Sequence, residues 1–316
     1  MQSMRRSNAL ALIAGGAFAA AGVPAIAQSE GTSVRMASMS IDAMGESYYG
    51  VDRGFFRDNG ISPALTTMTN SSAIVQSVLA GDLDAGMTNT VQLAVAVARN
   101  VPVQMIAPAS LYSSRDNTQG LAVAKNSPYT SAKDLIGGTI AVSALADFNQ
   151  LGISAWLDHN GVSPSSVHWV ELRFSEMGQA LARGTVQAAQ IAEPSMSAAV
   201  KAGDVRQFAD VYSAIAPEFA TIVWFSSKTW IQANPDALKK LRSGIFATAR
   251  WANSHYPESA EILAKAAKVD VATVSAGRRV YFATTNDPKF VVGPLAAAAK
   301  YGITSRLVTP AEYMAP

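Results

Sequence analysis

The sequence of 316 residues contains no cysteine and only 3 histidines. Without a thiol the chain cannot form a disulfide, a thiolate nucleophile, a zinc site built on thiolates or an iron–sulfur cluster. His159, His168 and His255 stand far apart among polar neighbours, which favours surface positions over metal ligation. We therefore expect neither a metal nor a cofactor.

Enzyme motifs are also missing. The chain has no Gly-x-Ser-x-Gly elbow, no Gly-x-x-x-x-Gly-Lys loop, no Gly-x-Gly-x-x-Gly and no His-Glu-x-x-His. Asp82 and Asp84 could form a carboxylate pair, but two acids that lead into a strand usually lie in a solvated turn. The sequence therefore favours a binding protein over an enzyme.

The first 27 residues have the layout of an export signal. Arg5 and Arg6 precede an apolar run over 9–23, and Ala25-Ile26-Ala27 gives the small-x-small pattern of a cleavage site, so we expect cleavage after Ala27. The run is shorter than the roughly 20 residues of a spanning helix, which disfavours a membrane anchor. The arginine pair leaves both the general secretory and the twin-arginine routes open. The expected location is the periplasm.

Charge excludes one class of partner. The net charge of +2 comes from Arg5 and Arg6, so the rest of the chain is formally neutral. No basic stripe with interleaved aromatic residues is present. We therefore expect no nucleic-acid binding.

Short β-rich runs alternate with helical stretches, which predicts an α/β fold. The chain is long enough for two packed cores, because single cores stop growing at roughly 250 to 300 residues. Strands are expected at 34–40, 61–67, 84–88, 139–142, 167–172, 188–191 and 220–226. Helices are expected at 48–59, 72–80, 90–100, 149–159, 176–183, 235–254, 257–268, 271–278 and 288–301.

One unit of the sequence occurs twice. Asn-Gly-Ile-Ser-Pro at 59–63 returns as Asn-Gly-Val-Ser-Pro at 160–164, and the Gly-containing segment 79–85 is echoed at 182–188. Such turn chemistry is common by chance, but two matches at nearly the same spacing favour two lobes of similar topology. We expect a first lobe from 28–120 plus 226–316, a second lobe from 121–225, and hinges near 120–125 and 221–226, with the helical C-terminal segment on the first lobe.

The ligand site has a predictable place. In open α/β sheets ligands bind beyond the C-terminal strand ends, where helix N-termini offer free N–H groups. Each polar candidate there could instead be a helix cap, and each aromatic one could belong to the core between lobes. The negative charge of Glu193 could instead stabilise a helix N-terminus through the helix dipole, or it could pair with Arg173. The candidates are Ser40, Asp42, Tyr48, Asn70, Asn89, Thr90, Ser143, Phe148, Asn149, Arg173, Phe174 and Glu193, with Tyr112 as an alternative to Tyr48.

Several segments carry a family resemblance. The stretches 49–61, 79–86, 120–128, 133–140 and 180–184 resemble, in this order, periplasmic solute-binding proteins of ABC importers, in particular the nitrate, sulfonate and taurine group. The resemblance runs from about residue 34 to about residue 265. It implies a type II periplasmic binding protein fold with a ligand cleft between two lobes. It also implies a monomer that closes on a small organic solute and delivers it to an ABC permease in the inner membrane.

Two other functions share this fold. One is a periplasmic sensor subunit that presents its ligand-bound form to a receptor. The other is an enzyme like the eukaryotic pyrimidine synthase of thiamine biosynthesis, which resembles these binding proteins. That enzyme relies on a cysteine-rich iron site, which this chain cannot form because it has no cysteine. Phe148 and Phe174 favour a ligand with a planar part, such as an aromatic carboxylate, beside the sulfonates that the resemblance implies.

Overall fold

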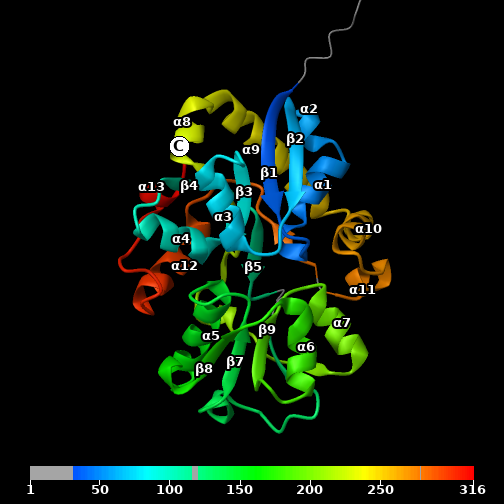
Figure 1. The fold of residues 1–316 in the computed structure, drawn as a ribbon, viewed down its shortest axis with the longest axis vertical. Coiled ribbons are helices and arrows are strands. Elements are labelled where there is room, and N and C mark those ends of the chain that lie inside the picture. Colours follow the sequence, from blue (N-terminus) through cyan, green and yellow to red (C-terminus); the bar gives the residue numbers. More distant parts are fainter. Residues whose placement is uncertain (1–30, 116–119, 278) are drawn as a thin grey trace, which may run out of the picture.

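The computed structural model describes residues 31–115, 120–277 and 279–316. The export signal expected at 1–27 lies outside the described residues. Figure 1 shows two lobes, each built on its own sheet with helices packed around it, and a small sheet at the junction between them. The α/β fold expected from the sequence is confirmed.

The first lobe contains a five-stranded sheet in the order β2-β1-β3-β12-β4. β1 pairs with β2 and β3 in parallel, and β12 runs antiparallel to both β3 and β4. The strands are β1 (Thr32–Ser38), β2 (Ile61–Thr67), β3 (Ala85–Asn89), β4 (Val103–Pro108) and β12 (Ile222–Ser227).

The second lobe repeats this topology. Its order is β8-β7-β9-β6-β10, with β7 parallel to β8 and β9, and with β6 antiparallel to β9 and β10. The strands are β6 (Gly120–Ala124), β7 (Thr139–Val142), β8 (His168–Glu171), β9 (Ala188–Ile191) and β10 (Val205–Ala209). Gly60 and Gly161, which occupy equivalent turns, have φ of 76° and 73°. The sequence repeat therefore reflects two lobes of one topology.

Most helices follow the predicted pattern, but α7, α8 and α13 were not predicted, and one predicted helix is divided. The sequence predicts a single helix over 48–59, but the chain forms two, because Gly54 between them takes a left-handed φ of 82°. The helices are α1 (Glu46–Asp52), α2 (Phe55–Asp58), α3 (Ser71–Ala80), α4 (Thr90–Ala98), α5 (Phe148–His159), α6 (Phe174–Ala182), α7 (Ser195–Ala202), α8 (Lys228–Ala233), α9 (Pro235–Ala252), α10 (Tyr256–Ala267), α11 (Val271–Ala276), α12 (Lys289–Lys300) and α13 (Pro310–Tyr313), together with short 3₁₀ turns such as η1 (Asp42–Met44).

A three-stranded sheet occupies the junction of the lobes. It consists of β5 (Ser110–Ser113) between β11 (Glu218–Ala220) and β13 (Tyr281–Phe282). The chain enters the second sheet at β6 and returns to the first at β12, and these strands fall on the hinge ranges predicted at 120–125 and 221–226. The lobe boundaries themselves stay a prediction.

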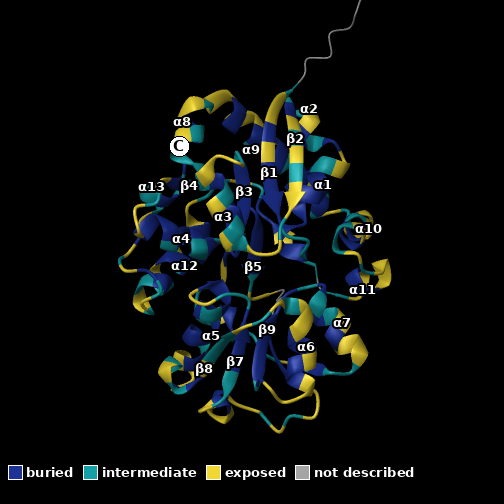
Figure 2. Ribbon diagram, viewed as in Figure 1, coloured by how far each residue is buried: buried dark blue, intermediate teal, exposed yellow. Residues whose placement is uncertain are grey.

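Each lobe has a buried core, as the dark interior in Figure 2 shows. The C-terminal helices complete the first lobe, since Leu241 of α9 and Leu263 of α10 pack into its core. α12 is shared, because its Val291 lies in the first-lobe core and its Ala298 in the core of the second. Within the described residues, none of the helices combines the length and apolarity needed to cross a membrane.

Candidate functional site

The two lobes meet where strands of both sheets end. The backbone N–H of Asp42, shortly after β1, donates a hydrogen bond to the carbonyl of Glu193, shortly after β9, at 3.2 Å. The C-terminal edge of the parallel strands in one lobe therefore faces the same edge in the other. This interlobe junction is where open α/β sheets place their ligands.

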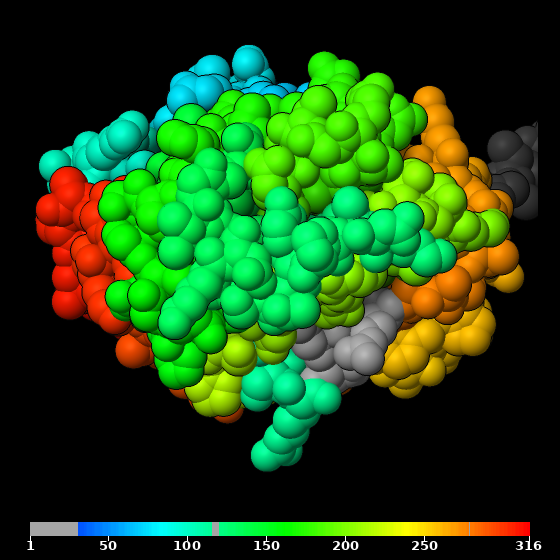
Figure 3. Space-filling model, turned by 90° about the horizontal axis from the view of Figure 1, so that it is seen from below, coloured from blue at the N-terminus to red at the C-terminus, as the bar shows by residue number. Residues whose placement is uncertain are grey.

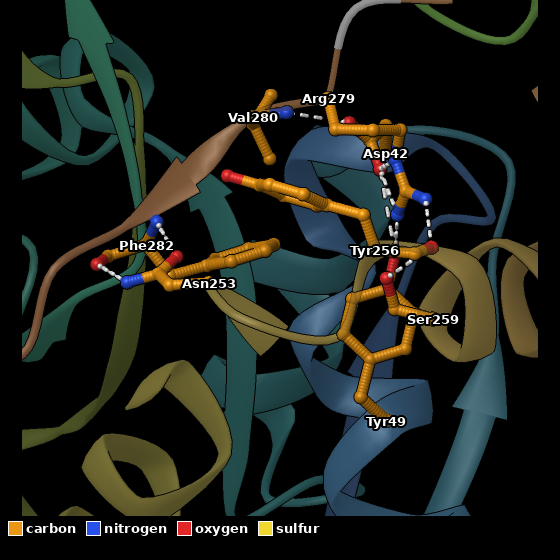
Figure 4. A network of polar contacts seen from close by, with 8 residues as sticks. All are labelled: Asp42, Tyr49, Asn253, Tyr256, Ser259, Arg279, Val280 and Phe282. Atoms are coloured by element: carbon orange, nitrogen blue, oxygen red, sulfur yellow. Dashed lines mark hydrogen bonds and ion pairs between the residues drawn. The ribbon is translucent and has the colours of Figure 1, made fainter. Parts of the chain in front are cut away.

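The carboxylate of Asp42 is held by the first lobe itself (Figure 4). Arg279 donates to it through Nε and lies within 2.8 Å of it through Nη2, and the N–H of Val280 donates to its other oxygen at 2.8 Å. Arg279 also donates to the hydroxyl of Tyr49 at 2.6 Å. Burial raises the pKa of Asp42, and the charge of Arg279 opposes that rise. The side chain of this candidate is therefore structural.

Four helix N-termini at the junction are capped by side chains of the chain itself. Asn70 on α3, Asn89 on α4, Asp147 on α5 and Glu193 on α7 each accept a backbone N–H, at N···O distances of 2.8 to 3.0 Å. Burial raises the pKa of Glu193, and its bond from the N–H of Ser197 opposes the rise. Each bond satisfies one N–H group of the helix start, as the capping alternative for Asn70 and Asn89 predicts.

The second lobe brings three candidates together. Asn149 donates to Ser143 at 2.7 Å and to Asp147 at 2.9 Å, and it accepts a hydrogen bond from the hydroxyl of Tyr212 at 2.7 Å. Burial raises the pKa of Asp147 to about 6, against the hydrogen bonds that it accepts. Phe148 packs in the core, with its ring 4.5 Å from that of Tyr212. The network fixes the loop between β7 and α5.

Arg173 and Glu193 do not pair. The Arg173 side chain is 82% exposed, and the ion pair that it forms is a 4.0 Å contact with Glu176. The alternative in which Arg173 neutralises Glu193 is therefore wrong, because the guanidinium extends into solvent at the start of α6. Phe174, the first residue of α6, is half-buried against the second-lobe core, and α6 has no side-chain cap.

The remaining candidates lie in the first lobe. Thr90 is buried, and its hydroxyl donates to the carbonyl of Ala220, so it ties α4 to the small sheet. The hydroxyl of Tyr48 lies 3.0 Å from that of Thr67, and Ser40 is half-buried just after β1. Tyr112 bonds to Asp210 at 2.7 Å and packs against Tyr212.

Sequence reasoning missed Arg279 and Tyr49, which hold Asp42 from within the first lobe, and Gly277, which lies at the junction. Arg279 is 237 residues from its partner Asp42, and no motif or spacing links them. Gly277 lies so close to Glu193 that a methyl group in place of its hydrogen would be 3.0 Å from Cδ of that side chain. Only the return of the C-terminal segment to the first lobe could have indicated this part of the site.

Two surface hollows lie away from the junction, each lined by one lobe. The first, of about 630 Å³, is lined by α8, α9 and Pro316, and the second, of about 480 Å³, by β8, α6 and Thr185. Across the described residues, no cluster of three or more His, Asp or Glu side chains could hold a metal ion.

A family profile described as NMT1/THI5 like matches residues 43–260, which is more than half of the chain. The chain belongs to the NMT1/THI5-like family. This membership confirms the resemblance to the nitrate, sulfonate and taurine group, since the taurine-binding periplasmic protein of Escherichia coli strain K12 is 28% identical over 189 residues. That match covers 60% of this chain and 57% of the relative, so it spans little more than half the relative's length.

Solved structures share the fold of this family member. The periplasmic aliphatic sulphonate-binding protein of Escherichia coli superposes with a TM-score of 0.73 at 14% identity, covering 90% of this chain and 97% of that one. A desulfurization enzyme also superposes, with a TM-score of 0.65 at 16% identity, over 90% and 96% of the two chains. The two-lobed periplasmic binding protein fold is therefore confirmed, and it carries both binding proteins and an enzyme.

Proposed function

We propose that this protein is the substrate-binding component of an ABC importer, which captures a small organic solute between its lobes and delivers it to a permease. The observation that carries this proposal is the meeting of two equivalent strand-end edges at the Asp42–Glu193 bond. The family membership and the names of the relatives support it. Like those relatives, it would act in the periplasm, after removal of residues 1–27.

We infer that the protein does not catalyse a reaction. Among the described residues of the junction, three carboxylates have structural partners: Asp42 binds Arg279, Asp147 caps α5 and Glu193 accepts the N–H of Ser197 in α7. A general acid or base needs a carboxylate that can reach a substrate proton. These side chains hold the backbone instead. We also propose that the protein acts as a monomer and binds no nucleic acid.

The exposed groups at the second-lobe edge favour one kind of solute. Arg173 offers an exposed cation, and Phe174 beside it offers part of an aromatic ring. At each of four neighbouring helix N-termini one N–H group is already bound by a side chain, which leaves fewer N–H groups for a bare inorganic anion. We therefore propose a solute with one acidic group and an apolar or planar body, such as a sulfonate or an aromatic carboxylate. Ser40 and Tyr48 would contact it from the first lobe.

Thermal unfolding of residues 28–316 against taurine, alkanesulfonates, aromatic carboxylates, nitrate and pyrimidines tests this function. A solute at about 100 times its dissociation constant adds about 2.7 kcal/mol of stability, which raises the midpoint by several degrees. With a solute that does so, R173A and F174A should each weaken binding about ten-fold. R183A removes another exposed arginine at the far end of α6 and is the matched control. No shift with any acidic organic solute would contradict the proposal.

A further inference from the structure

One exposed apolar side chain lies at the edge of the second lobe that faces the first. Leu145 follows the end of β7, and this residue is 50% exposed. Of the large apolar residues that are exposed in the described part of the chain, it alone directly follows the C-terminal end of a parallel strand. Such strand ends are where open α/β sheets bind ligands. Leu145 therefore lies where the apolar part of a solute would need a partner.

The loop that carries Leu145 is held by hydrogen bonds to two side chains. The N–H of Leu145 donates to Oε1 of Glu171 at 2.6 Å. The N–H of the next residue, Ala146, donates to Oε1 of Gln150 at 2.6 Å. Both acceptors belong to regular elements, since Glu171 ends β8 and Gln150 lies in the first turn of α5. The side chain of Leu145 is therefore exposed from a fixed backbone and not from a loose turn.

The backbone of this loop has a conformation that side chains disfavour. Ala146 has a φ of 53°, in the left-handed region that residues other than glycine seldom adopt. No glycine relieves the turn, since the loop reads Ser-Ala-Leu-Ala-Asp over 143–147. Strained backbone of this kind persists only where the surrounding contacts impose it, and it is concentrated at ligand sites. The strain is thus a second observation that indicates a binding role for the loop.

Glu171 connects the loop to the strand end that carries the proposed solute contacts. The N–H of Leu172 donates to the carbonyl of Val142 at 3.0 Å, so the ends of β7 and β8 lie side by side. Arg173 and Phe174 come directly after this end of β8. A fixed apolar group and an exposed cation therefore belong to adjacent loops of one edge, which suits a solute with an acidic group and an apolar body.

We propose that Leu145 contacts the apolar body of the bound solute and sets the length of that body which the site prefers. The inference rests on the proposed function and deepens it, because it assigns the selection of the solute's apolar part to one side chain. Since the loop is already fixed, burying Leu145 adds to the affinity without a further cost for ordering the backbone. Glu171 is then a positioning residue, which acts through the N–H of Leu145.

Calorimetric titration with two series of acids of graded length tests the proposal. The probes are the linear alkanesulfonates from ethane- to hexanesulfonate and the para-alkylbenzoates from methyl to butyl. Each methylene group that becomes buried against an apolar partner should raise the affinity of the parent protein by up to about four-fold. L145A removes the partner, so the gain from the shortest to the longest member should fall about ten-fold, while the shortest member keeps its affinity. L145M keeps an apolar side chain of similar volume and should keep the gain.

I136A is the matched control, because Ile136 is 58% exposed in the same lobe but precedes β7, at the opposite end of the strand. Figure 3 views this far side of the second lobe, with the bluish-green segment that leads into β7 in front. I136A should bind both series like the parent protein. E171A releases the loop but keeps Leu145, so it should weaken the longest members several-fold and the shortest ones little.

The outcomes separate this inference from the function on which it rests. An equal gain of affinity with length in L145A and the parent protein would overturn the role of Leu145 and leave the proposed function standing. If the parent protein binds no member of either series, the acidic solute of the proposed function is contradicted, and the role of Leu145 with it. The parent protein alone therefore distinguishes the two failures.

Discussion

At the scale of single residues, the most informative side chain is one that the sequence did not single out. Glu46 on α1 is fully buried, and one of its oxygens accepts a 2.6 Å hydrogen bond from Nε1 of Trp224. Its other oxygen has no hydrogen-bond partner among the described residues. Burial raises the pKa of Glu46 from 4.5 to about 8, against the bond from Trp224. At neutral pH the folded protein therefore carries this carboxyl group in its protonated form.

This protonation makes the stability depend on pH. The unfolded chain releases the proton near pH 4.5 and the folded protein only near pH 8, so stability is full below pH 4.5 and falls as the pH rises between these values. The loss amounts to about 1.4 kcal/mol for each pKa unit, or several kcal/mol in all. E46Q keeps an acceptor for Trp224 without an ionisable group. We expect it to be more stable than the parent protein at pH 8 and similar at pH 4.5.

Urea unfolding of both proteins at several pH values measures the difference. E261Q on α10 is the control, because Glu261 is exposed and its loss should leave the profile unchanged. The same fall in stability for E46Q and the parent protein between pH 4.5 and 8 would show that Glu46 ionises normally in the fold.

Other residue roles were partly predictable. Asn70 and Asn89 stand before helical runs, and their capping role follows from local chemistry alone. The partner of Asp42 could not be predicted in this way, because Arg279 reaches it only after the C-terminal segment has folded back on the first lobe. Local patterns therefore identify caps and turns, and they do not identify ion pairs between distant segments.

At the scale of elements, the short turn η1 depends on a segment from the far end of the chain. Arg279 neutralises the buried carboxylate of Asp42, so R279A would leave that charge with the N–H of Val280 as a hydrogen-bond donor but without a countercharge. Removing one member of a buried ion pair typically costs 3–5 kcal/mol, and we expect R279A to lower the free energy of unfolding by about that amount. Because Asp42 can be made neutral, D42N in the R279A background should recover part of the loss. Chemical denaturation of the two variants and the parent protein measures both effects.

R206A provides the comparison for this prediction. Arg206 donates to the backbone carbonyls of Ser127 and Tyr129 and lies over the ring of Phe208, so its removal leaves no buried carboxylate without a countercharge. Its loss should destabilise the protein less than R279A. Equal losses for the two variants, or no recovery with D42N, would mean that the ion pair does not stabilise η1.

Glycine residues that end helices explain why the bounds of many elements were predictable. β2, β7 and β9 begin and end where the sequence indicates, and Gly60, Gly81 and Gly184 take left-handed conformations after helices. The strands at 103–108, 110–113, 120–124 and 205–209 were not predicted. β4 pairs with β12 and β6 pairs with β10, so these strands are stabilised by partners far away in the sequence and not by their own pattern.

At the scale of the whole molecule, the sequence repeat predicts the duplicated topology, and the family resemblance predicts the two-lobed fold. The contacts between the lobes were beyond prediction, because they depend on where two separately folded units meet. Gly277 shows this well, since its sequence surroundings indicate only a helix end. The function proposed here depends on that junction being the place where solute binds.

Hydrogen–deuterium exchange, with and without a solute that raises the unfolding midpoint, tests this central claim most directly. We predict slower exchange in both lobes at once, in the strand-end segments 40–45 and 143–149, because a solute at the junction contacts both edges and closes the lobes over itself. Slower exchange in one lobe alone, over α8 and α9 or over β8 and α6, would place the solute in one of the single-lobe hollows and contradict the account.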